Sequence, residues 1–215
     1  MIHRYLDPDE SLGELLFGLI MALTVTLGVH LLSPEQLSNP RDLAVALIGC
    51  NVAWGIIDAA LYLLGSVFAR NQRVHFMRKL RTLPEASALQ AIREEYGLDD
   101  AHLAVEQDLA VFYRAALDVL RHAKVERAHL RGKDWLAALM IVILVAVTAV
   151  PGALPILLVG DPVLALRLAN LLQIGLLFIV GYHWARYSGA DPWRTGAAIV
   201  GFGVALVGVA IALGG

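Results

Sequence analysis

Five long apolar stretches alternate with polar segments along the chain. A helix needs about 20 apolar residues to cross the hydrocarbon core of a bilayer. The predicted spans are residues 12–32, 43–68, 134–159, 163–184 and 195–213. This pattern predicts an all-α integral membrane fold, with five transmembrane helices and a cytosolic helical insert between spans two and three. The predicted boundaries are 1–69 for spans one and two, 70–133 for the insert, and 134–215 for spans three to five.

The insert differs from its surroundings because it alternates apolar and charged residues at helical spacing. A capping box at Thr82-Leu83-Pro84-Glu85 predicts a helix that runs to about Tyr96. Asp99 or Asp100 then begins a second helix, which we expect to reach about Leu130. The apolar face expected on this helix comprises Leu103, Leu109, Phe112, Ala116, Leu117 and Leu120.

Basic residues give the expected orientation. Residues 69–134 hold 12 of the 17 lysines and arginines, and the loop after span four is also basic. Because cytoplasmic loops carry an excess of lysine and arginine, we expect the N-terminus and the insert in the cytoplasm and the C-terminus outside. The first ten residues lack a basic segment and a cleavage site, so the first span is expected to remain as an anchor.

Composition narrows the function classes. Hydrophobic residues make up 58% of the chain and the mean hydropathy is +0.66, which places it in a lipid bilayer. The net charge of −2 gives no reason to expect nucleic acid as a partner. One cysteine excludes an internal disulfide framework. Neither a hydrolase triad with supporting glycines nor a phosphate-binding loop is present, so we do not expect an enzyme.

Span two carries the most informative polar residue, Asp58. A carboxylate near the middle of a span costs about 2.5–3.5 kcal/mol, so it is expected to face other helices or a water-filled cavity. Asn51, Trp54 and Tyr62 share its helix face at spacings of three and four residues. This stripe predicts an ion path. The alternatives are a structural hydrogen bond for Asp58 and interhelical bonding for Asn51.

Span one offers further candidates. Glu14 lies near its start, and Met21 and Thr24 share one face farther along. These side chains either line the same path or pack between helices. In span three, Pro151 and Pro155 predict a kinked or broken helix.

Only the insert has spacings typical of metal ligands. His102 and Glu106 are four residues apart, as are His122 and Glu126, and His129 follows three residues later. On a helix, each set would place nitrogen and oxygen donors on one face. The alternative is a solvated, salt-bridged surface, since arginines and a lysine adjoin the second set.

Short motifs resemble the vacuolar iron transporter family. They are Leu16-Phe17-Gly18, the run 51–55, the proline-rich run 149–155, and the glycine-rich close at 181–215. The layout of five spans with an insert after the second is also similar, and the likeness is to a divergent bacterial branch. The resemblance implies a homodimer in a bacterial inner membrane that exports ferrous iron or manganese in exchange for protons. It also implies an ion path between the two chains and an insert that gathers metal through glutamates.

The chain departs from that family at the intramembrane acids. Met21-Ala22 stands where the family has Asp-Gly, Asn51 replaces a glutamate, and Asp58-Ala59 replaces Ser-Met. Our hypothesis is a transporter of Fe²⁺ or Mn²⁺ with Asp58 as central ligand or proton carrier and no permanently bound cofactor. The alternative hypothesis is a membrane scaffold, partner subunit or sensor that retains the fold without transport.

Overall fold

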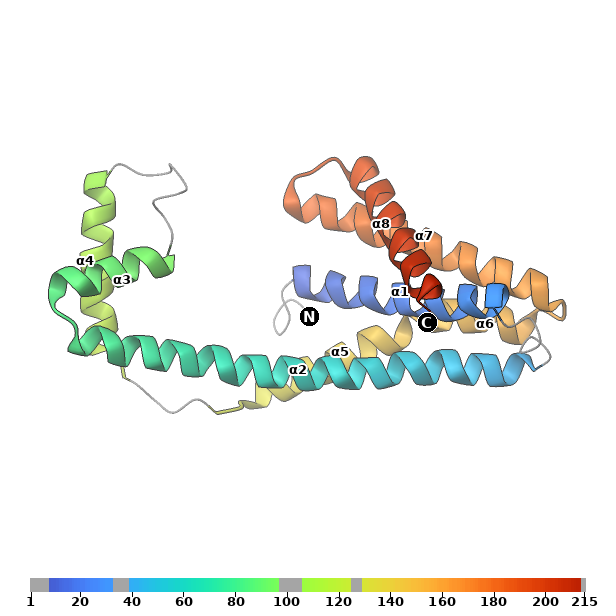
Figure 1. The fold of residues 1–215 in the computed structure, drawn as a ribbon, viewed down its shortest axis with the longest axis horizontal. Helices are drawn as coiled ribbons and strands as arrows, with labels where there is room; N and C mark the ends of the chain where they lie inside the picture. The colour runs from blue at the N-terminus through green and yellow to red at the C-terminus, as the bar shows by residue number, and fades with distance from the viewer. Residues whose placement is uncertain (1–7, 33–38, 97–105, 125–128, 214–215) are drawn as a thin grey trace. The chain divides into compact units, whose positions relative to one another are not determined.

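The computed structural model describes residues 8–32, 39–96, 106–124 and 129–213. These residues form helices and no strands (Figure 1). The helices are α1 (Pro8–Leu32), α2 (Pro40–Thr82), α3 (Glu85–Tyr96), α4 (Glu106–His122), α5 (Gly132–Val147), α6 (Val150–Leu158), α7 (Pro162–Ser188) and α8 (Pro192–Ala212). Five stretches are long and apolar enough to cross a membrane: α1, α2, α5 together with α6, α7, and α8. The predicted fold class is therefore confirmed.

The chain divides into two compact units. The first, here called the bundle unit, comprises Met1–Leu63 and Arg131–Gly215. The second, the insert unit, comprises Leu64–Leu130. α2 begins in the bundle unit and continues without interruption to Thr82, well past the end of the apolar run. The helix continues beyond its apolar sequence because residues 69–82 include good helix formers and contain no glycine or proline.

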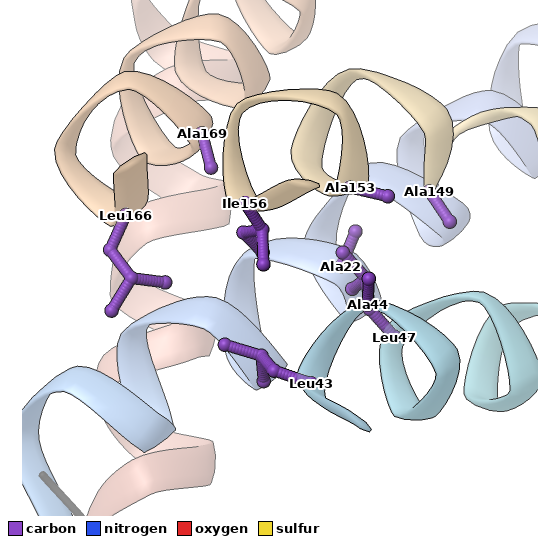
Figure 2. Close-up of a cluster of buried hydrophobic side chains, with 9 residues drawn as sticks. All are labelled: Ala22, Leu43, Ala44, Leu47, Ala149, Ala153, Ile156, Leu166 and Ala169. Carbon is purple, nitrogen blue, oxygen red and sulfur yellow. The ribbon is translucent and has the colours of Figure 1, made fainter. Parts of the chain in front are cut away.

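Small residues hold the bundle unit together. Alanines dominate the cluster where α1, α2, α6 and α7 meet (Figure 2). A Cβ atom on Gly18 would lie 2.2 Å from Thr148 Oγ1, and one on Gly152 would lie 2.2 Å from Gln173 Nε2. Lipid is as apolar as a leucine side chain, so helices in a bilayer associate through such close backbone contacts.

The third span is broken, as its prolines predicted. α5 ends at Val147 and α6 begins at Val150, which leaves Thr148 and Ala149 outside both helices. Pro151 and Pro155 have no N–H group, so two helical hydrogen bonds cannot form there. α6 packs against α7, and Ala153 and Ile156 are buried. The break therefore lies against protein rather than only against lipid, as irregular backbone at membrane depth requires.

The insert unit has a core of its own. Leu80, Ala88, Ile92, Tyr113 and Leu117 are buried together, contributed by the end of α2, by α3 and by α4. This is the pattern of a water-soluble helical unit, in which amphipathic helices share their apolar faces.

Arginine side chains bond to backbone carbonyl groups at the end of α2 and at the end of the insert unit. Arg121 donates to the carbonyl oxygens of Leu80 and Leu83 at 3.3 and 2.9 Å. A cation at that position caps the C-terminal end of α2, where carbonyl groups lack helical partners. Arg70 donates to His129 O at 2.8 Å, which ties the returning chain to α2.

Three details of the predicted insert are wrong. Thr82 does not cap α3: it is the last residue of α2, and its hydroxyl donates back to Lys79 O at 2.9 Å. The second helix ends at His122 instead of Leu130, and Arg81 donates to the carbonyl oxygen of Ala123 just beyond that end. Phe112, expected on the apolar face of that helix, is 44% exposed, and Tyr113 is buried in its place.

Candidate functional site

Asp58 interacts electrostatically with a second carboxylate. It is partly buried in α2, and its Oδ2 atom has no hydrogen-bond partner in the described part of the chain. Glu14 of α1 interacts electrostatically with Asp58 and with Glu10. The structure thus brings together two residues that the sequence analysis proposed separately.

The pairing of α1 with α2 explains this proximity. Asn51 bonds to Gly18 O, and the rings of Phe17 and Trp54 meet edge to face at 5.8 Å. As the residue number increases along α2, the number of the facing residue on α1 decreases, so the two helices are antiparallel. One turn farther along, the same register directs Asp58 and Glu14 toward each other, which agrees with their electrostatic interaction. Carboxylate oxygens from two helices are ligands that hard divalent cations accept.

Asn51 occupies a different environment from Asp58. Its side chain is fully buried, and Nδ2 lies 3.0 Å from Gly18 O, 3.2 Å from Val145 O and 2.9 Å from Thr148 Oγ1. The amide therefore joins α2 to α1 and to the break after α5. These contacts favour the interhelical role over the lining of an ion path. Asn51 Oδ1 is left without a partner among the described residues.

The remaining path candidates are partly buried. Thr24 donates its hydroxyl to Ile20 O at 2.9 Å within α1, which leaves its oxygen lone pairs available. Tyr62 packs against the cluster formed by Ala59 of α2 with α5 residues such as Ile141. Met21 lies on α1 with intermediate exposure. Of the three, only Tyr62 lies one turn from Asp58 on the same helix.

The predicted metal ligands of the insert do not gather in the described residues. His102 and Glu126 lie outside those residues, and Glu106 is the first residue of α4. His122 is exposed at the end of α4, with Nδ1 2.8 Å from Asp118 O. His129 is exposed and follows α4, so helical spacing no longer places it on the face of His122. No group of three or more His, Cys, Asp or Glu side chains that could hold a metal ion occurs in the described ranges.

Comparison with known proteins decides the family. A family model described as the VIT family matches residues 66–215, which is more than half of the chain. The chain belongs to the VIT family. This confirms the resemblance seen in the sequence. VIT family proteins are transporters of divalent iron and manganese and are not enzymes. No curated protein matches the chain.

The match to the VIT family begins after the candidate acids. Residue 66 follows both Glu14 and Asp58 in the chain, so the family assignment depends on the end of α2, the insert unit and the last three spans. The sequence of α1 and of the first part of α2 therefore has to be interpreted from its own chemistry.

One polar cluster of this VIT family member was missed from the sequence. Thr26 Oγ1 lies 2.7 Å from Asn170 Oδ1 and 3.1 Å from Gln173 Oε1, between α1 and α7. Gln173 is fully buried, and its Nε2 has no partner in the described ranges. The amides of Asn170 and Gln173 in an otherwise apolar span could have indicated such a cluster, because buried polar groups need hydrogen-bond partners. That the partner is Thr26 on α1 could not be predicted from the sequence, because it depends on how α1 and α7 pack together.

Proposed function

We propose that this VIT family member exports Fe²⁺ or Mn²⁺ from the cytosol in exchange for protons, as a homodimer. The observation that carries the proposal is the electrostatic interaction between Glu14 on α1 and Asp58 on α2. The family supplies the class of cargo. The acidic pair supplies anionic oxygen in a chain whose sequence departs from the family at the expected intramembrane acids.

In this proposal the two carboxylates alternate between metal and protons. Two carboxylates that interact electrostatically favour a divalent cation, and when the cation leaves they favour uptake of a proton. A homodimer would double the pair to four carboxylates along a path between the chains. Thr24 and Tyr62 contribute neutral oxygens to that path and Met21 contributes a thioether, while Asn51 fixes the helices around it.

The same proposal assigns an orientation. The chain crosses a bacterial inner membrane five times, with the N-terminus and the insert unit in the cytoplasm and the C-terminus outside. The arginines at 70, 73, 78 and 81 support this, because basic residues that follow a span favour the cytoplasmic side. The proposed boundaries remain 1–69, 70–133 and 134–215.

Transport into proteoliposomes tests the acidic pair. We expect Asp58→Asn and Glu14→Gln each to lower Fe²⁺ or Mn²⁺ flux at least about tenfold, since even indirect partners of metal ligands contribute about 10–100-fold in affinity. Asp42→Asn is the matched control, because Asp42 is an exposed acid in the first turn of the same helix as Asp58. Equal flux in wild type and Asp58→Asn would remove Asp58 from the mechanism.

A scaffold, partner subunit or sensor is the second candidate function. It is favoured by the finding that no group of three metal-binding side chains occurs in the described residues. Titration of the full chain in detergent with Fe²⁺ and Mn²⁺ separates the two candidates. Absence of both metal binding and flux in the wild type would favour the second. A pH-sensitive dye inside the same proteoliposomes tests the proton coupling.

A further inference from the structure

A cluster of uncharged oxygen atoms lies between α1 and α7 in the bundle unit. Its centre is the hydroxyl of Thr26, which four other oxygen atoms surround. Thr26 Oγ1 lies 2.7 Å from Asn170 Oδ1, 3.1 Å from Gln173 Oε1, 3.1 Å from Ala22 O and 3.2 Å from Leu23 O. Thr26 and Gln173 are fully buried, and Asn170 is partly buried. Five oxygen atoms therefore meet in the interior of the bundle.

Hydrogen bonding alone does not account for these contacts. A threonine hydroxyl has one proton, so it can donate to only one of the four oxygen atoms around it. The amides of Asn170 and Gln173 both present oxygen to Thr26. Oxygen atoms that touch without a shared proton repel one another, since each carries a partial negative charge. A positive ion among them would replace that repulsion by attraction.

The amide of Gln173 contributes through its oxygen rather than its nitrogen. Its Nε2 atom lies against α6, where a Cβ atom on Gly152 would be only 2.2 Å away. Glycine leaves the room that the amide needs at this point, in the first turn after the break in the third span. Nε2 is buried and has no hydrogen-bond partner in the described part of the chain. A buried amide normally satisfies its nitrogen, so the role of this side chain has to come from its oxygen.

We infer that this cluster binds a monovalent cation, with Na⁺ as the ion that fits it. Hydroxyl, amide and backbone carbonyl oxygens are ligands of hard cations, and carbonyl oxygens can replace the hydration shell of an ion inside a membrane protein. Oxygen ligands about 2.3–2.6 Å from one small ion lie about 3 Å from each other, which is the spacing around Thr26. The close spacing favours Na⁺ over the larger K⁺. A divalent cation is disfavoured, because removing an ion from water costs more as its charge increases and none of the three side chains is charged.

This site is separate from the proposed ion path. The acidic pair belongs to α1 and α2, whereas the oxygen cluster joins α1 to α7. Membrane transporters often coordinate a coupling ion beside a broken helix, and Gln173 packs on α6 directly after such a break. A bound Na⁺ would hold α1, which carries Glu14, against α7. The inference therefore adds a second kind of ion to the transporter at a second place.

Equilibrium binding of radiolabelled Na⁺ to the purified full chain in detergent tests the inference, with choline chloride keeping the ionic strength constant. We expect saturable binding, with unlabelled Na⁺ competing better than K⁺. Thr26→Val keeps the shape of the side chain but removes the hydroxyl, and should weaken binding at least about tenfold, as for other polar contacts to a charged group. Thr26→Ser keeps the hydroxyl and should bind like the wild type. Thr82→Val is the matched control, because the hydroxyl of Thr82 bonds to a carbonyl of its own helix in the insert unit.

Two further variants keep the test decisive. Asp58→Asn should retain Na⁺ binding, and its loss there would place the ion at the acidic pair and overturn the inference. If Thr26→Val does not fold, Gln173→Met, which keeps the side-chain length without the amide, should weaken binding by a similar factor. Absence of saturable Na⁺ binding by the wild type, or equal binding by the wild type and Thr26→Val, also overturns it. The amides would then turn their nitrogens toward Thr26 and form an ordinary hydrogen-bond network.

Discussion

The bundle unit and the insert unit differ in how much apolar surface they expose. In the bundle unit, large apolar side chains such as Leu171 are two-thirds exposed. In the insert unit, Leu80 and Ile92 are fully buried, and arginines occupy much of the surface. Both units bury leucines, and Leu47 of the bundle unit is also fully buried. The bundle unit in addition exposes many large apolar side chains along its membrane-length helices, which is the difference expected between a lipid environment and an aqueous one.

The difference extends to what stabilises each unit. The insert unit removes apolar surface from water, which contributes about 25 cal/mol for each Å² buried. Lipid offers the bundle unit no equivalent gain, so its helices depend on close packing at glycines and on buried polar bonds such as those of Asn51. Mutations of matched residue types should therefore have different effects in the two units.

The largest expected effect is the loss of a leucine from the insert core. Leu80→Ala should lower the free energy of unfolding by about 2–5 kcal/mol, because a cavity replaces a fully buried side chain. Hydrogen–deuterium exchange of the chain in detergent would locate the loss, and we expect faster exchange in α3 than in α7. Leu171→Ala in α7 is the control, with little expected change. Comparable destabilisation by both variants would show that the units do not differ in this way.

A glycine that closes a helix contact should have the next largest effect. Gly18→Ala places a Cβ 2.2 Å from Thr148 Oγ1 and 3.1 Å from Val145 O, so helices must separate or Thr148 must move. We expect a loss of about 1–3 kcal/mol, measured by thermal unfolding in detergent. Gly49→Ala is the control, because no atom lies within 4 Å of its Cβ position. It should be neutral or stabilising by about 0.5–1 kcal/mol, and an equal loss there would contradict the role of close packing.

Much of the fold could be predicted because it depends on the lengths of apolar runs. Each span needs only enough apolar residues, and the break in the third span follows from two prolines. The ends of the insert helices could not be predicted in the same way. The hydroxyl of Thr82 donates to a carbonyl of its own helix instead of capping the next one. The carbonyl just beyond the end of α4 accepts from Arg81 of α2, which is 42 residues distant in the chain.

The residues of the candidate site could be predicted from the sequence, but their positions relative to one another and to the inside of the bundle could not. Helical periodicity places Asn51 and Asp58 on one face of α2, and both do face α1. It does not specify which of them lies inside the bundle. That depends on where α5 crosses α2, because Val145 and Thr148 enclose Asn51 while Asp58 remains partly exposed. The electrostatic interaction of Asp58 with Glu14 likewise follows from the register of α1 against α2.

The smallest expected effect separates these two residues of α2. Asn51→Ala removes the amide that joins α2 to Gly18 O and Thr148 Oγ1, and buried polar bonds between membrane helices contribute about 0.6–1.7 kcal/mol. We expect a loss of stability in that range by thermal unfolding, with metal flux per folded protein close to that of the wild type. Asn71→Ala, an exposed asparagine of the same helix, controls for the substitution itself and should change neither quantity. If Asn51→Ala lowered flux as much as we expect for Asp58→Asn and left stability unchanged, Asn51 would belong to the ion path. The contact of α2 with α1 and α5 would then have to depend on small residues rather than on the amide of Asn51.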